Sequence, residues 1–408
     1  MRGSVISLFG AGLFGLANFF IRRQLSVELS VADYGIFYGV FSLYSVIFCF
    51  MELGLGRTGT LLIAAAGEDT KRRDKVFTGV FQLKVLLSLC CAVAAAFWCF
   101  RQYSELSRSI IVLFSGLFVC KTLLGALHAL WNGQKKYATQ QLFPLLISAL
   151  TLLCLLPDAK ITLSRAAFFF FASTLAGLVS GWFYSRFTGL GRLCMEFDPG
   201  LCRELLTTGG VIAVCTTLIS AGYYLDTVML SALKSHESVG LYNAALPVMQ
   251  IVQAGMVFPA VFLPIAVELN KNKEYTKLLA FVRYALLIAL AALLPVWGFF
   301  YFTSEFLIRF LFDVRYIAAA PAIPILCVGL VFFTLGNFLM QIIICLKQLR
   351  SMSVISLITF VCNIVLNYIL IKHLDFCGAA WAMLTTHAIF ALLCCIVLEH
   401  SIKKLKHQ

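Results

Sequence analysis

The sequence predicts an all-α integral membrane protein of about twelve transmembrane helices, in two six-helix lobes related by a parallel pseudo-two-fold repeat. Three observations predict this fold class. The composition is extremely apolar, apolar runs of membrane-spanning length follow one another along the chain, and a weak internal repeat divides these runs into two equal sets.

Composition sets the class of protein. The chain has 408 residues, of which 61% are hydrophobic and 12% are charged, whereas a soluble domain is about 25% charged. This much apolar surface must face lipid. The first apolar run begins almost at Met1 and lacks a small-residue cleavage pattern, so we expect a retained helix and not a signal peptide.

Apolar runs give the number of helices, because a helix needs about 20 apolar residues to cross the hydrocarbon core. The connections between the runs are short and leave no room for a separate soluble domain. The predicted spans are 3–21, 34–53, 79–100, 109–130, 138–157, 164–185, 206–233, 239–267, 278–303, 317–346, 352–371 and 376–398.

Lysines and arginines between the spans predict the orientation. With the N-terminus in the cytoplasm, they favour the inner side by two to one, as the positive-inside rule requires. We therefore expect a multi-pass membrane protein with both termini cytoplasmic, and the resemblance described below implies that the membrane is the cell inner membrane. The net charge of +13 reflects this topology. Nucleic acid is not expected as a partner, because the basic residues form no single patch.

An internal repeat relates the two halves. The stretch Ser26–Leu43 matches Ser231–Val248 at an offset of 205 residues, and each copy opens a long apolar helix. In the first copy, Ser30 and Asp33 have the spacing of a capping box. The repeat predicts an N-lobe of residues 1–203 and a C-lobe of residues 204–408, the second ending in a short basic tail.

The helix after each copy is too long to cross the membrane straight. Residues 34–66 would span roughly 50 Å as one helix, and the glycines within Glu52–Gly59 are the natural place for a break. At the same offset, Pro259 and Pro264 stand in the second half. Paired interruptions of this kind point to a transport site, although a helix that merely bends along its neighbours is the alternative.

Motifs for catalysis, metals or cofactors are not recognised. The sequence has no H-E-x-x-H, G-x-S-x-G or Walker motif. Most of the fifteen cysteines fall in apolar runs, and none forms C-x-x-C, so we interpret them as small apolar residues. We therefore expect no enzyme activity, no cofactor and no metal site.

Ionisable residues inside the spans are functional candidates, because a charge near mid-membrane costs about 2.5–3.5 kcal/mol on insertion scales. Lys121 lies near the middle of its span and is the first candidate for a cavity. Lys84 and Arg283 lie near the ends of theirs, so we expect them to snorkel outward. We expect His128 and His387 to be packing residues.

The chain resembles a known family at two places. "RRQLSVELSVADYGIFYGVFSL" with "FMELGLGRTGT" in the first half, and Asp226 with "VGLYNAA" (Val239–Ala245) in the second, are similar to Wzx-type polysaccharide and O-antigen flippases. These belong to the multidrug/oligosaccharidyl-lipid/polysaccharide (MOP) exporter superfamily. The resemblance implies a flippase that moves an undecaprenyl-pyrophosphate-linked oligosaccharide to the external leaflet during polysaccharide (for example lipopolysaccharide) biosynthesis.

Such a cargo needs cations for its phosphates and polar or aromatic side chains for its sugars. The expected partners are the lipid-linked oligosaccharide and membrane lipids, with a coupling ion (H⁺ or Na⁺) and polysaccharide assembly proteins as further candidates. The candidate substrate-binding residues are Arg22, Arg23, Glu52, Arg57, Lys121 and Asp226.

Two other classes stay open. A drug or cation antiporter of the same superfamily would share the fold, but it would be expected to use more membrane carboxylates than Asp226 and Glu52. A membrane glycan polymerase or ligase would be expected to carry a large external loop. Arg22 and Arg23 also have two interpretations: they bind lipid phosphate in the outer headgroup zone, or the first helix continues past them and one faces a cavity and pairs with Asp226.

Overall fold

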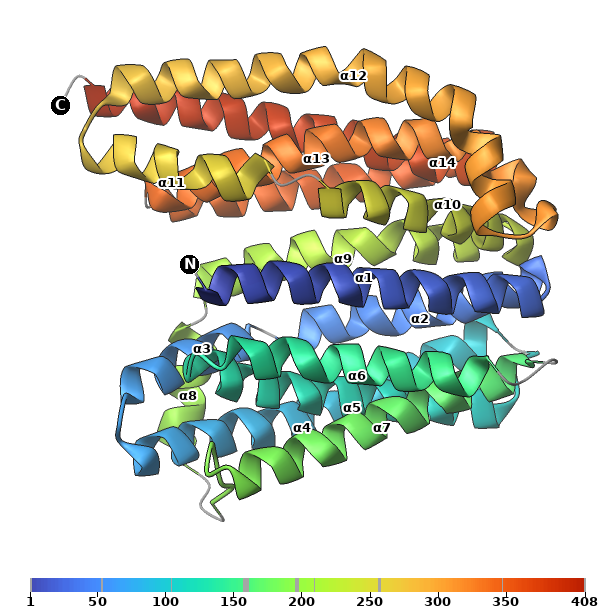
Figure 1. Cartoon of the computed structure of the whole chain (residues 1–408), viewed down its shortest axis with the longest axis horizontal. Helices are drawn as coiled ribbons and strands as arrows, with labels where there is room; N and C mark the ends of the chain where they lie inside the picture. The colour runs from blue at the N-terminus through green and yellow to red at the C-terminus, as the bar shows by residue number, and fades with distance from the viewer. Residues whose placement is uncertain are drawn as a thin grey trace. The chain divides into compact units, whose positions relative to one another are not determined.

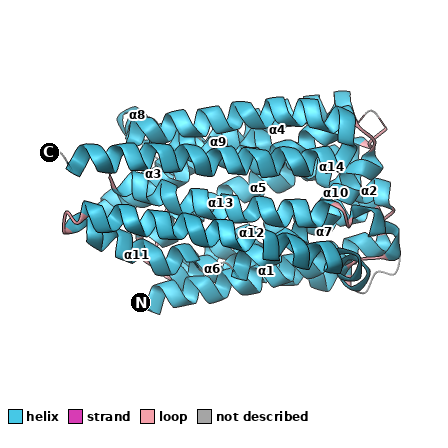
Figure 2. Cartoon of the chain, turned by 90° about the horizontal axis from the view of Figure 1, so that it is seen from above, coloured by secondary structure: helices cyan, strands magenta, loops and turns pink. Residues whose placement is uncertain are grey.

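A computed structural model describes residues 2–52, 54–103, 105–156, 161–194, 198–208, 210–255, 258–346 and 348–406. In this part of the chain every regular element is a helix (Figure 2). Eight of the helices in these ranges are long and apolar enough to cross a membrane. The all-α membrane fold class is therefore confirmed.

The chain divides into two compact units, Met1–Tyr224 and Leu225–Gln408, and the division falls inside a helix. The lobe boundary predicted between residues 203 and 204 stays a prediction. The helices up to this division are α1 (Arg2–Glu28), α2 (Val31–Glu52), α3 (Leu55–Ala66), α4 (Thr70–Gln102), α5 (Arg108–Gly133), α6 (Tyr137–Leu155), α7 (Leu163–Phe187), α8 (Pro199–Thr208) and α9 (Gly210–Leu233), which crosses it.

The C-terminal unit continues with α10 (His236–Gly255), α11 (Phe258–Lys271), α12 (Tyr275–Leu311), the 3₁₀ helix η1 (Val314–Ala319), α13 (Ala322–Cys345) and α14 (Leu349–Lys406). Helix α14 is interrupted at Asp375, whose φ of 54° and ψ of −136° are not helical, so it contains two of the predicted spans. Within the described ranges, each predicted span coincides with a helix, a broken pair of helices or a segment of α14.

One helix is central in each unit. In the N-terminal unit α5 packs against α2, α3, α4, α6 and α7, and α4 to α7 run side by side (Figure 1). In the C-terminal unit α13 packs against α10, α11, α12 and α14. Lys121, the first candidate from the sequence, therefore lies on the central helix of its unit.

The predicted capping box is present at the start of α2. The Ser30 Oγ accepts the Asp33 N–H at 3.0 Å and donates to the Asp33 carboxylate at 2.7 Å. The repeat preserves this arrangement at the start of α10, where the Ser238 N–H donates to the Ser235 Oγ at 3.3 Å and the two serine hydroxyls hydrogen-bond at 3.1 Å. These caps satisfy N–H groups that no helical carbonyl can reach.

The predicted break in the second helix is confirmed. Helix α2 ends at Glu52, and Gly54 has a φ of 70° and a ψ of 11°, the left-handed conformation that ends one helix before α3 begins. In the second half α10 ends at Gly255 and α11 begins at Phe258, with residues 256–257 outside the described ranges. Pro264 lies within α11 and does not break the helix, so that part of the prediction is wrong. Pro259 lies next to Phe258, just after the undescribed residues, and its part in an interruption stays a prediction.

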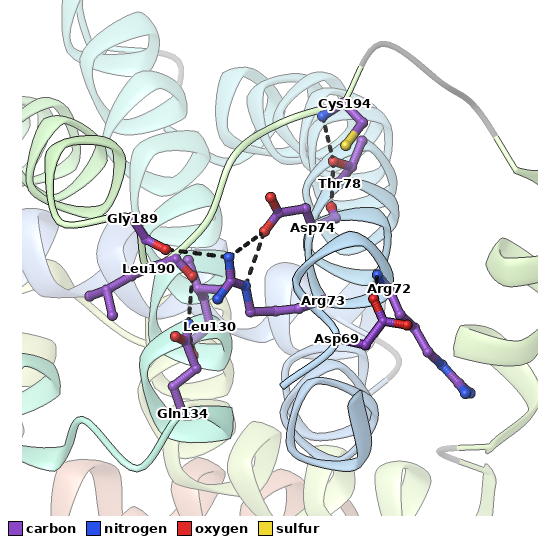
Figure 3. A network of polar contacts seen from close by, with 10 residues as sticks. All are labelled: Asp69, Arg72, Arg73, Asp74, Thr78, Leu130, Gln134, Gly189, Leu190 and Cys194. Carbon is purple, nitrogen blue, oxygen red and sulfur yellow. Dashed lines mark hydrogen bonds and ion pairs between the residues drawn. The ribbon is translucent and has the colours of Figure 1, made fainter. Parts of the chain in front are cut away.

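Partly buried and exposed polar contacts hold the segment after α7 against α4 and α5 (Figure 3). The Arg73 guanidinium, 12% exposed, pairs with Asp74 at 3.0 Å and donates to the Gly189 carbonyl at 3.3 Å. The Gln134 amide donates to the Leu190 carbonyl at 2.7 Å. The buried Leu190 side chain joins the apolar core that Trp131 and Phe143 help to form. This segment therefore closes one end of the N-terminal helix bundle.

We expect Gly54→Ala to destabilise the protein by about 1 kcal/mol, because a Cβ is unfavourable in the left-handed region. Thermal unfolding in detergent measures the effect. Gly12→Ala in α1 is the matched control: a Cβ there meets nothing within 4 Å, and alanine is the better helix former. Equal melting temperatures for the two variants would contradict a strained junction at Gly54.

Candidate functional site

A cavity of about 200 Å³ lies in the N-terminal unit where α2 to α5 meet. We call it the lysine cavity, because Lys84 from α4 and Lys121 from α5 both line it, together with one carboxylate, Glu52. The remaining lining residues are Ser45, Phe48, Cys49, Leu55, Leu87, Ser88, Cys91, Phe118, Thr122, Gly125 and Tyr224. The formal charge of this lining is positive.

Lys84 does not snorkel, and that prediction is wrong. Its side chain is only 2% exposed, and its Nζ donates to the Glu52 Oε1 at 2.8 Å. Two glycines make room for the pair. A Cβ on Gly125 would stand 3.1 Å from the Lys84 Nζ, and a Cβ on Gly56 would stand 2.9 Å from the Glu52 Oε1. The Lys84 ammonium stays inside the bundle because the Glu52 carboxylate pairs with it there and the two glycines leave room for both groups.

Lys121 projects into space between aromatic rings. Its Nζ lies 4.5 Å from the centroid of Phe41 and 5.1 Å from that of Phe118. An ammonium over a ring face gains about 0.5–2 kcal/mol, but the rings accept no hydrogen bond as strong as one from an oxygen anion. The Lys121 side chain is exposed to the cavities that it lines. It is therefore positioned to donate to an anion that enters.

A second cavity of about 450 Å³ shares Lys121 with the first. We call it the glutamine cavity, because Gln140 and Gln141 of α6 line it, and Asn18 and Thr174 face it from α1 and α7. His128, Ser148 and Thr151 add further polar atoms. Of these residues sequence reasoning named only His128, as a packing residue, because it searched the spans for ionisable groups and not for neutral amides and hydroxyls. The adjacent pair Gln140–Gln141 in an apolar run was the available signal.

The arginine candidates lie apart from these two cavities. Helix α1 continues to Glu28, as one of the two interpretations required, and the Arg22 guanidinium lies 4.4 Å from the centroid of Tyr38. Arg23 and Arg57 are exposed. Arg22, Arg23 and Arg57 are not among the described lining residues of either cavity. The predicted pairing of Arg22 or Arg23 with Asp226 would link residues of different units, and it stays a prediction.

Asp226 lies in the C-terminal unit at the centre of a buried polar cluster. It is 1% exposed and accepts hydrogen bonds from the Tyr242 hydroxyl at 3.2 Å, the Asn363 amide at 3.0 Å and the Asn367 amide at 2.7 Å. All three donors are neutral. We call these four residues the aspartate cluster. Sequence reasoning missed both asparagines, although their spacing of one helical turn in an apolar run was visible.

The cluster has unused acceptors. The side-chain carbonyl oxygens of Asn363 and Asn367 are buried and make no hydrogen bond with the described residues. The cluster therefore offers a carboxylate and two amide oxygens, which are hard oxygen ligands. Chemically it can take up a proton or a small cation. His387, by contrast, has an ordinary packing role against Phe333 and the Gly329 carbonyl, 4.7 Å and 3.2 Å away.

Solved structures of membrane transporters are similar to this chain. An inward-facing multidrug resistance MATE family transporter of the MOP superfamily matches with a TM-score of 0.71 at 14% identity, over 97% of this chain and 95% of that one. A MOP superfamily transporter from Pyrococcus furiosus, described as having a binding pocket of reverse polarity that suggests a different function, matches with a TM-score of 0.61 at 14% identity, over 99% and 95%. At these identities the likeness shows the fold.

Sequence comparison gives the family. An uncharacterized membrane protein of Methanocaldococcus jannaschii is 22% identical in an alignment that covers 89% of this chain and 76% of that protein. The family model described as polysaccharide biosynthesis protein matches residues 2–270. This match covers more than half of the chain and identifies it as a member of the polysaccharide biosynthesis protein family.

Proposed function

We propose that this protein is a flippase for an undecaprenyl-pyrophosphate-linked oligosaccharide, which it moves from the cytoplasmic to the external leaflet for the assembly of a polysaccharide such as O-antigen. The observation that carries the proposal is Lys121, whose ammonium lies close to the rings of Phe41 and Phe118, makes no ion pair with a described residue and lines the lysine cavity. A cation held in this way favours an anionic cargo. Under this proposal the protein lies in the inner membrane with both termini in the cytoplasm.

The neighbouring glutamine cavity suits the sugars of the cargo. Amide and hydroxyl side chains such as Asn18, Gln141 and Thr174 both donate and accept hydrogen bonds, as sugar hydroxyls do. Because Lys121 lines both cavities, phosphate and sugar could be held on either side of one residue. Polysaccharide assembly proteins would receive the cargo outside.

A drug or cation antiporter is the rival with the same fold. Its cargo would need acidic cavities, but the lysine cavity has two lysines for one carboxylate, and the glutamine cavity is lined by neutral residues and Lys121. The similar transporter from Pyrococcus furiosus is described as having a binding pocket of reverse polarity, so the polarity of the binding pocket differs among proteins with this fold. A glycan polymerase or ligase is less well supported, because the solved structures with a similar fold are described as transporters.

We further propose that the aspartate cluster holds the coupling ion, H⁺ or Na⁺. The Asp226 carboxylate is buried among neutral donors, and bringing a charge into such a site is costly unless a cation accompanies it. The binding of a cation would neutralise the carboxylate. Turning the two asparagine amides would present their unused carbonyl oxygens to it.

Lys121→Ala is expected to lower export of the lipid-linked oligosaccharide by about 10- to 100-fold, the effect of losing one charge-assisted contact. Lys121→Arg should keep part of the activity, since it keeps the charge. Export in cells, normalised to protein level, measures both. Lys71→Ala is the control: it also removes one lysine charge, but from the exposed first turn of α4, outside both cavities, and it should leave export unchanged. Normal export by the Lys121→Ala variant would rule out a cargo contact at this residue.

Asp226→Asn should remove the dependence of transport on an ion gradient, because it keeps the size of the side chain and removes its charge. Transport into proteoliposomes, with an imposed H⁺ or Na⁺ gradient and without one, measures this. Glu237→Gln, an exposed carboxylate in the first turn of α10, is the control. Gradient-driven transport that persists in the Asp226→Asn variant would place the coupling site elsewhere.

A further inference from the structure

The lysine cavity contains its own anion. Glu52 holds the Lys84 ammonium at 2.8 Å, so one of the two cations in the cavity is already neutralised, while Lys121 makes no ion pair with a described residue. An anionic cargo entering this cavity meets a carboxylate that repels it and occupies one of its two binding groups. Charge repulsion and occupancy both make Glu52 a competitor of the cargo phosphate.

The two members of the pair differ in burial. The Lys84 side chain is 2% exposed, and its ammonium is packed close to Gly125 of α5. The Glu52 side chain is 49% exposed and can leave without opening the core. Gly125 stands one helical turn from Lys121 on the same face of α5, so the face of α5 that meets the Lys84 ammonium also carries Lys121, and both lysines line the same cavity.

Glu52 also has a special place in the backbone. It is the last residue of α2, two positions before Gly54, whose left-handed conformation joins α2 to α3. The ion pair therefore ties the end of α2 to α4 beside the junction. Loss of the pair removes this link, and the junction is then held by apolar contacts such as those of the buried Leu55.

We propose that Glu52 is an internal substitute for the cargo phosphate: it pairs with Lys84 while the cavity is empty, and a phosphate group of the cargo displaces it. This rests on the proposed function. Lys84 then exchanges one anion for another and is never left buried without a partner, the state that costs most. Displacement leaves two lysines for the two phosphates of a pyrophosphate and releases the end of α2 at the junction with α3.

Binding of farnesyl pyrophosphate to the purified protein in nanodiscs tests this exchange. If the pair is closed about 90% of the time, Glu52→Gln should bind this probe about tenfold more tightly, because a competent state that is rarely populated weakens apparent affinity in proportion. Lys84→Gln should weaken binding, and adding Glu52→Gln to it should change nothing further. Glu68→Gln, which removes an exposed carboxylate after α3, should bind like the wild type.

Two further measurements separate the proposal from general effects. Farnesol carries no phosphate, so its binding should be the same in all variants. The melting temperature of Glu52→Gln should fall without ligand and rise more than that of the wild type when farnesyl pyrophosphate is added. Should this variant fail to fold, Glu52→Asp supplies the test, because its shorter side chain weakens the pair and should give a smaller gain in affinity.

The outcomes distinguish this proposal from the function on which it rests. Saturable binding to the wild type without tightening in Glu52→Gln or Glu52→Asp overturns the exchange and leaves the flippase proposal standing. Tightening that persists in the Lys84→Gln background also overturns it, because the gain would then come from net charge alone. No binding of farnesyl pyrophosphate to the wild type or to either Glu52 variant overturns both proposals.

Discussion

A polar group within hydrocarbon must find its partner inside the protein, and the main features of this chain follow from that constraint. An unsatisfied backbone N–H or C=O in lipid costs several kcal/mol, so each crossing segment is helical. Where α2 gives way to α3, Gly54 supplies the backbone conformation that ends one helix and begins the next. The same constraint acts on side chains, and it explains where the ionisable residues of the spans are found.

The two charged centres meet this constraint differently. Lys84 has a charged partner, the Glu52 carboxylate, whereas Asp226 has three neutral donors, Tyr242, Asn363 and Asn367. An ion pair can exchange one of its members for another ion of the same sign. A carboxylate among neutral donors can instead gain a cation. The first arrangement suits recognition of an anionic cargo, and the second suits uptake of a coupling ion, so a flippase driven by an ion gradient would need both.

Neutral polar residues complete this division of roles. The glutamine cavity has no carboxylate among its described lining residues, and Lys121 joins it to the lysine cavity. Hydrogen bonds from amides and hydroxyls are weaker than charge-assisted ones, so they can hold a varied glycan without fixing it. A cargo with a constant pyrophosphate and a variable glycan fits one cation-lined and one amide-lined cavity better than it fits two sites of the same kind.

The sequence by itself determined the features that depend on neighbouring residues. The lengths of apolar runs predicted the helices, the cap at Ser30 and the break at Gly54 were visible in short motifs, and the depth of Lys121 in its span marked it as a candidate. Only the tertiary structure decided which side chains meet. Glu52 and Lys84 are 32 residues apart, and Asp226 lies 137 and 141 residues from its two asparagines. Apolar length fixes that a helix crosses the membrane but not its rotation about its own axis, and that rotation, set by packing against its neighbours, brings these groups together.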